Sequence, residues 1–271
     1  MSQAKFHQLF PKMPAQKILL ISVISVSLFL ALWAVVAELG VVSKVFLPSP
    51  FVVFNKLGPL IADGHGGHGL FKHIGISLGR IMLSLLLATL LAVPLGILVA
   101  ISDWFKSIVD PFVEFYRPLP PLAYLPLIII WLGIGELSKV TLISLAIFAP
   151  IFLNTRAGVL AIPLERIQVA ECLGASKKQI IYHIIFPSSL YSILTGIRIG
   201  VGFGWTTLVA AEMVAATHGL GHMVLSVSEF LVTEVVLIGI VIIGFLAIMT
   251  DWVLRVLIRK IVHWNSEEAT G

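Results

Sequence analysis

The sequence predicts an all-α membrane protein that crosses the bilayer about six times. Of its 271 residues, 58% are hydrophobic and only 12% are charged, whereas an ordinary soluble domain carries about 25% charged residues. Two stretches, Ile18–Ala37 and Ile81–Ile101, run for 20 and 21 residues without a charge. Because a helix needs about 20 apolar residues to cross the bilayer core, each stretch predicts a transmembrane span.

Four further apolar stretches complete the predicted set of spans. They are Pro118–Gly135, Val140–Thr155, Ser188–Ala216 and Val235–Thr250. Six spans place both chain ends on one side of the membrane. If that side is cytoplasmic, its segments hold 11 of the 18 Lys and Arg residues. Because Lys and Arg favour the cytoplasmic side, we expect both termini to be cytoplasmic. The basic charge balance is thereby explained by topology, and we expect no nucleic-acid partner.

The predicted organisation is a short lead, one membrane domain and a tail. Residues 1–17 form a cytoplasmic lead, 18–258 the transmembrane domain and 259–271 a cytoplasmic tail. The first span could instead be a signal peptide, but its apolar run exceeds the usual core of about 7 to 15 residues, which favours an uncleaved helix. The single cysteine, Cys172, falls on the cytoplasmic side and cannot form an internal disulfide.

The segment between the first two spans is the longest predicted external loop. Its Leu47–Pro50 sequence, LPSP, predicts an extended turn, since proline disfavours helix at the preceding residue. Phe51–Ile61 predicts a short amphipathic helix at the membrane surface. His65, His68 and His73 invite interpretation as metal ligands, but no carboxylate or cysteine completes a site. We favour a flexible loop tip and expect no metal.

Prolines crowd the entrance to the third span. The sequence YRPLPPLAYLP covers Tyr116–Pro126 and contains four prolines. Proline removes backbone donors and bends helices, and in lipid the freed groups must be satisfied by protein or by a water-lined cavity. Two interpretations stay open: a kink that shapes packing, or a broken helix that lines a path.

The fifth span carries two patterns at helical spacing. Gly196, Gly200 and Gly204 share one face and predict close helix packing, within the chain or at a subunit interface. Arg198, Trp205 and Glu212 form a second stripe, seven residues apart. Charges inside a membrane usually face a bundle interior or a wet cavity, although both could instead snorkel to opposite interfaces. The stripe is about 21 Å long at 1.5 Å per residue, so its two charges cannot grip one small ligand together.

The polar segment 163–187 predicts a helix, a tight turn and a second helix. Pro163 suits a first helical turn and Gly174 a C-terminal stop, while Ser176 and Gln179 form a capping box. We expect Pro187 to end this unit where the fifth span begins. Its transmembrane flanks exclude docking into a DNA groove. A membrane-surface anchor and a docking element for a soluble cytoplasmic partner remain, and the lysines near the second helix's positive end favour the latter.

This segment resembles the signature cytoplasmic loop of bacterial ABC importer permeases. The family pattern is Glu-Ala-Ala, three residues, Gly, nine residues, Ile, one residue, Leu-Pro. Gly174, Ile184 and Pro187 match that spacing, while Gln168, Val169 and Phe186 depart from it. The resemblance implies an ATPase-coupling set made of Gln168, Val169, Ala170, Glu171, Gly174, Ala175, Ser176, Lys177, Ile184 and Pro187.

Other motifs extend the resemblance over nearly the whole chain. "YRPLPPLAYLPLIIIWLGIGELSK", "GWTTLVAAEMVAATHGLG" and "EFLVTEVVLIGI" are similar to the subfamily that imports nitrate, sulfonates and taurine, and most of all to taurine permeases. The resemblance implies a type I permease fold in the bacterial inner membrane. It also implies two permease subunits, normally identical, a periplasmic substrate-binding protein and two ATPase subunits that bind ATP and magnesium. This chain has no phosphate-binding loop motif and no catalytic grouping, so we expect it to be neither the ATPase nor another enzyme.

The sequence therefore predicts a permease that imports taurine or a related small sulfonate by ATP-driven alternating access. Nitrate, bicarbonate and aliphatic sulfonates are alternative substrates, and an ATP-independent channel or secondary transporter is the alternative from another class. A path is predicted along the third and fifth spans. Arginine could bind a sulfonate and Trp205 an ammonium. The predicted path residues are Arg117, Tyr124, Arg198, Trp205, Thr206 and Glu212.

Overall fold

The computed structural model describes residues 14–40, 42–64 and 69–262, and these residues form helices without any strand. The helices are α2 (Ala15–Glu38), α3 (Pro50–Asp63), α4 (Leu70–Ile101), α5 (Asp103–Tyr116), α6 (Pro121–Leu132), α7 (Glu136–Leu160), α8 (Leu164–Cys172), α9 (Lys177–Ile180), the π-helical turn η1 (Ile181–Ile185), α10 (Phe186–Ala215), α11 (Leu220–Glu229) and α12 (Thr233–Ile261). The predicted all-α class is confirmed.

Five of the described helices are long and apolar enough to cross a membrane, and the bent pair α5–α6 makes a possible sixth span. The prediction of about six spans is therefore confirmed. The third span, for which the prolines left a kinked or a broken helix open over Pro118–Gly135, is a broken helix. α5 and α6 meet at 107°, and α6 has only 12 residues, about 18 Å at 1.5 Å per residue. Pro118 and Pro120 break the helix between them because proline has no N–H to donate and disfavours helix at the residue before it.

Two other helix boundaries differ from the prediction. α4 begins at Leu70, eleven residues before the apolar run at Ile81, and this added part includes Arg80, whose charge is neutralised by Glu212 inside the protein. Pro187 does not end the 163–187 unit, since the helix runs on from Lys177 to Ala215. Pro187 cannot donate to the preceding turn. The π-helical turn beside it is closed instead by the Phe186 N–H, which donates to the Ile181 carbonyl.

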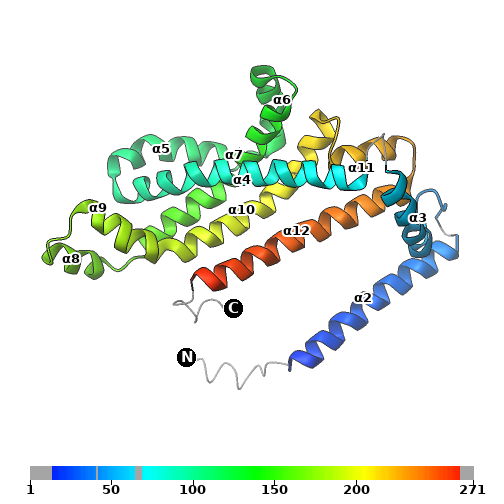
Figure 1. Cartoon of the computed structure of the whole chain (residues 1–271), viewed down its shortest axis with the longest axis horizontal. Coiled ribbons are helices and arrows are strands. Elements are labelled where there is room, and N and C mark those ends of the chain that lie inside the picture. Colours follow the sequence, from blue (N-terminus) through cyan, green and yellow to red (C-terminus); the bar gives the residue numbers. More distant parts are fainter. Residues whose placement is uncertain (1–13, 41, 65–68, 263–271) are drawn as a thin grey trace.

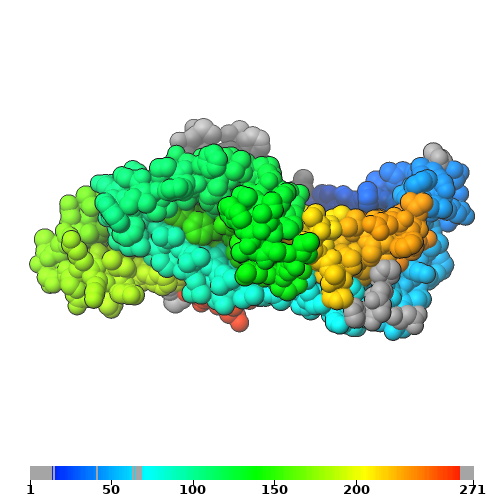
Figure 2. All heavy atoms as spheres, turned by 90° about the horizontal axis from the view of Figure 1, so that it is seen from above, coloured from blue at the N-terminus to red at the C-terminus, as the bar shows by residue number. Residues whose placement is uncertain are grey.

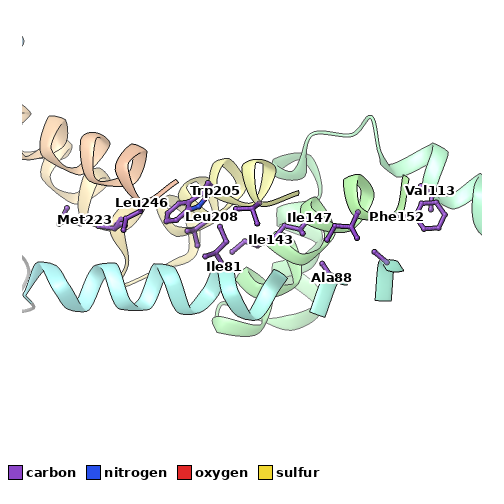
Figure 3. Close-up of a cluster of buried hydrophobic side chains, with 14 of the residues drawn as sticks. Ile81, Ala88, Val113, Ile143, Ile147, Phe152, Trp205, Leu208, Met223 and Leu246 are labelled. Atoms are coloured by element: carbon purple, nitrogen blue, oxygen red, sulfur yellow. The ribbon is translucent and has the colours of Figure 1, made fainter. Parts of the chain in front are cut away.

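The core lies where α4, α7 and α10 pack together (Figure 3). Ile81 of α4, Ile147 and Phe152 of α7 and Leu208 of α10 are at most 1% exposed. α11 and α12 extend this cluster with Met223 and Leu246. α4, α7 and α10 therefore form the centre of the bundle.

The three glycines of the fifth span lie at the contact between α10 and α7. A Cβ added at Gly196 would lie 2.8 Å from Cβ of Asn154 and 3.1 Å from Cα of Ile151. One added at Gly204 would lie 2.8 Å from Cδ1 of Ile147. The absent side chains let the two helices approach closely within the chain.

Figure 1 shows an elongated molecule with α8 and α9 at one end of the long axis and α3 and α11 at the other. α6 stands on one face of the bundle beside α5, as the space-filling view shows (Figure 2). α2 is exposed along most of its length.

The helix expected over Phe51–Ile61 is present as α3. It packs through Leu60 against Val235 and Ile238 of α12. Of the three histidines considered as metal ligands, His65 and His68 lie outside the described residues. His73 is buried on α4, with its Nδ1 3.1 Å from the backbone nitrogen of Gly219.

Candidate translocation and coupling sites

The 163–187 segment has a rigid turn between its two helices. Gly174 has a φ of +81°, which glycine adopts without steric cost. The Ala175 N–H donates to the Ala170 carbonyl (3.0 Å), so α8 ends in a hydrogen-bonded glycine cap. Ser176 and Gln179 then cap α9 reciprocally, because the Ser176 N–H donates to Gln179 Oε1 (2.8 Å) and Ser176 Oγ accepts from the Gln179 N–H (3.4 Å). These bonds fix the angle between the helices.

One face of this segment is fastened to the membrane helices. Ala170, Ile180 and Ile185 are buried against Ile97 of α4 and Val159 of α7. A displacement of the segment would therefore move the adjoining ends of α4 and α7.

The opposite face is open. Leu173 is 83% exposed and borders a hollow of about 320 Å³ that reaches Gly174 and Ile184. Of the residues that the resemblance implies for coupling, Ala170 is buried and Ala175, Ile184 and Pro187 are half-buried. The exposed ones are Gln168, Val169, Glu171, Gly174, Ser176 and Lys177. An apolar side chain surrounded by polar ones, on a rigid base, suits a protein contact.

The six predicted path residues do not share one cavity. Arg117 and Tyr124 line a cavity of about 530 Å³, together with Asn154 of α7 and Phe203 of α10. The prolines between α5 and α6 line the same cavity. The broken third span thus borders an open volume beside α10, so its irregular backbone does not face lipid alone.

Arg198, Trp205 and Thr206 line a second cavity, of about 570 Å³, between α10 and α12. Arg198 Nε lies 2.5 Å from Oδ1 of Asp251, so α12 supplies a counter-ion that the sequence reasoning did not pair with it. Trp205 is buried, and its indole N–H donates to Thr250 Oγ1 (3.0 Å).

Glu212 belongs to neither cavity. Its side chain is fully buried and accepts hydrogen bonds from Ser77 Oγ (2.7 Å), Arg80 Nη1 (2.7 Å) and the Gly221 N–H (2.8 Å). Arg80 also donates from Nε and Nη2 to both carboxylate oxygens of Glu136 (2.7 and 2.6 Å). The stripe of Arg198, Trp205 and Glu212 is therefore divided between two surroundings, the cavity between α10 and α12 and the buried ion cluster.

Sequence reasoning missed Arg80, Glu136 and Lys139 as members of this ion cluster. Lys139 Nζ lies 2.8 Å from the Glu136 carboxylate. In the sequence, each of the three is a charge beside an apolar run. The available signal was that each charge lies at the edge of a span, where charges of opposite sign from different helices can meet at one depth.

These features define a multi-pass helical membrane protein with cavities beside a central helix and a capped docking element at one end. The chain belongs to the family of binding-protein-dependent transport system inner membrane components, whose model matches residues 92–263. It is thus the permease subunit of an ABC importer, not a catalytic subunit. Membership implies an ATPase and a substrate-binding protein as partners, and rules out the ATP-independent transporter.

Several relatives match nearly the whole chain. The taurine transport system permease protein TauC of Escherichia coli is 46% identical, with 94% of this chain and 93% of the relative covered. The putative aliphatic sulfonates transport permease protein SsuC of Bacillus subtilis is 35% identical, with 89% and 86% covered. The nitrate import permease protein NrtB of Synechocystis is 30% identical, with 84% of both chains covered.

Among solved structures, an inward-facing MetNI methionine ABC transporter matches with a TM-score of 0.63 at 17% identity. The match covers 71% of this chain and 96% of that one. It shows the permease fold.

Proposed function

We propose that this permease imports taurine or a closely related small sulfonate. The observation that carries the proposal is the 46% identity to a taurine permease over 94% of this chain, against 35% for an aliphatic sulfonate relative and 30% for a nitrate relative. Nitrate and aliphatic sulfonates, the substrates named for the less similar relatives, are the competing substrates.

The segment 163–187 receives the ATPase. Its exposed Leu173, its rigid glycine turn and its buried attachment to α4 and α7 support this role. The transmembrane domain covers 18–258, with a cytoplasmic lead of residues 1–17 and a cytoplasmic tail of 259–271. Both termini are cytoplasmic, since this orientation puts most Lys and Arg residues inside. Two copies of the chain pair to form the path.

Substrate passes along α10 by alternating access. The path residues are Arg117 and Tyr124 on one side of α10 and Arg198, Trp205 and Thr206 on the other, with Glu212 beyond them. The two cavities beside α10 support this proposal. Cysteines placed singly along α10 of a Cys172→Ser chain test it: Gly202→Cys and Thr206→Cys should react with a water-soluble thiol reagent, whereas Gly200→Cys and Gly204→Cys should not. The reverse pattern would refute the path.

Substrate choice is tested on the transporter reconstituted with its ATPase and binding protein. Taurine should stimulate ATP hydrolysis and be taken up, and nitrate should do neither. Uptake of nitrate without taurine would assign the chain to the nitrate group instead.

A further inference from the structure

Two buried cations lie beneath one exposed carboxylate at the end of the bundle where α11 begins. Arg80 is 5% and Lys139 3% exposed, yet the side chain of their shared partner, Glu136, is 63% exposed. The guanidinium grips this carboxylate through two nitrogens, at 2.7 and 2.6 Å, and the ammonium lies 2.8 Å away. Glu136 therefore lies between these two buried cations and the solvent.

Without Glu136, the charged side chains beneath it have a net positive charge. Glu212 is fully buried, with Arg80 Nη1, Ser77 and the Gly221 N–H as donors. Arg80 also donates to the His218 carbonyl (2.7 Å). With Arg80 and Lys139 positive and Glu212 negative, the site carries a net charge of +1 when Glu136 is absent. A buried net charge is costly, so the site requires one monoanion.

Glu136 lies at an exposed helix start that two glycines precede. It is the first residue of α7 and follows Gly133, with a φ of +77°, and Gly135. The residue between these glycines, Ile134, is 80% exposed. Arg80 and Lys139 hold the Glu136 carboxylate through three contacts, so it leaves only when another anion accepts the same hydrogen bonds. Exchange for such an anion keeps the charges of the site balanced.

We propose that Arg80 and Lys139 form a binding site for a small sulfonate, which Glu136 occupies as an internal counter-ion until substrate displaces it. Two sulfonate oxygens accept from the guanidinium Nε and Nη2 as the carboxylate does, and a third faces Lys139. In a zwitterionic aminosulfonate, the ammonium pairs with the displaced Glu136. The identity of the ligand and the site's outward position rest on the proposed function. The site is then the first contact of substrate with the permease.

Thiol chemistry tests this site in the complete transporter in lipid nanodiscs, with Cys172 replaced by serine. In the Glu136→Cys variant, an anionic sulfonatoethyl methanethiosulfonate should react on the order of tenfold faster than its cationic trimethylammonioethyl counterpart. Methanesulfonate and taurine should slow that reaction, and choline should not. The matched control is Leu137→Cys, whose native side chain is 62% exposed and which should show neither the charge preference nor the protection.

Adding Lys139→Gln to Glu136→Cys should remove the protection and lower the anionic preference severalfold. Equal rates for the two reagents, or protection by no anion, would overturn the site. Ile134→Cys keeps the ion cluster intact, and saturating methanesulfonate should change its labelling rate severalfold; an unchanged rate counts equally against the proposal. Taurine uptake by the unaltered transporter is scored separately. A nitrate importer would fail that assay while its site was still protected by nitrate.

Discussion

The guanidinium of Arg80 lies 2.7 Å from the carboxylate of Glu212, across 132 residues of sequence. Arg80 is 5% exposed and Glu212 is fully buried, so this ion pair joins α4 to α10 in the interior. The Glu212 carboxylate also accepts hydrogen bonds from Ser77 Oγ and from the Gly221 N–H at the start of α11. These contacts therefore hold α4, α10 and the start of α11 together.

Arg80→Ala should destabilise the permease by about 3 to 5 kcal/mol, because it leaves the Glu212 carboxylate buried without its cation. Denaturant unfolding in detergent measures the change in free energy. Arg255→Ala is the control, since Arg255 pairs with Asp251 at an exposed position and should cost at most about 1 kcal/mol. Arg80→Met combined with Glu212→Met should recover much of the loss. Equal costs for Arg80→Ala and Arg255→Ala would contradict the role given to the pair.

Gly196→Leu should lower stability by about 1 to 3 kcal/mol or prevent folding, because its side chain would meet the backbone of α7. Gly202→Leu is the matched control on the same helix, where an added Cβ meets nothing within 4 Å. Thermal unfolding of the two purified variants makes the comparison. A Gly202→Leu variant as unstable as Gly196→Leu would argue against the α7–α10 contact.

Gly174→Val should uncouple transport from ATP hydrolysis and reduce recovery of the ATPase with the permease. An added Cβ meets no atom within 4 Å, so the expected damage comes from the left-handed backbone, which β-branched residues avoid. Gly174→Asn should be much milder, because asparagine tolerates that conformation. Co-purification and substrate-stimulated ATPase activity are the measurements. Normal coupling in Gly174→Val would remove the turn from the proposed mechanism.

Trp205 and Thr250 should show a coupling energy of about 0.6 kcal/mol, the average for polar contacts between membrane helices. The double-mutant cycle uses Trp205→Phe and Thr250→Val, with the free energy of unfolding as readout. The control cycle pairs Trp205→Phe with Thr206→Val, because the Thr206 hydroxyl donates to the Phe203 carbonyl. A coupling energy in the control cycle and none between Trp205 and Thr250 would contradict a stabilising role for the Trp205–Thr250 hydrogen bond.

The apolar runs predicted most of the membrane helices because burial of about 20 apolar residues in lipid is decided locally. The turn at Gly174 and the Ser176–Gln179 cap were equally predictable, since both depend on residues within one or two turns. The break in the third span was predicted in part. Its prolines indicated an interruption of the helix, but the 107° angle between α5 and α6 depends on what each helix packs against.

The sequence by itself determined the membrane class, the approximate number of spans and the shape of the 163–187 segment, because hydropathy, proline and glycine act over short stretches. Only the tertiary structure decided the partners of the intramembrane charges. Helical spacing put Arg198 and Glu212 on one stripe, yet Arg198 pairs with Asp251 and Glu212 with Arg80. A charge in a low-dielectric interior is stabilised by whichever opposite charge the fold brings within hydrogen-bonding distance, and that neighbour lies on another helix, far away in the sequence.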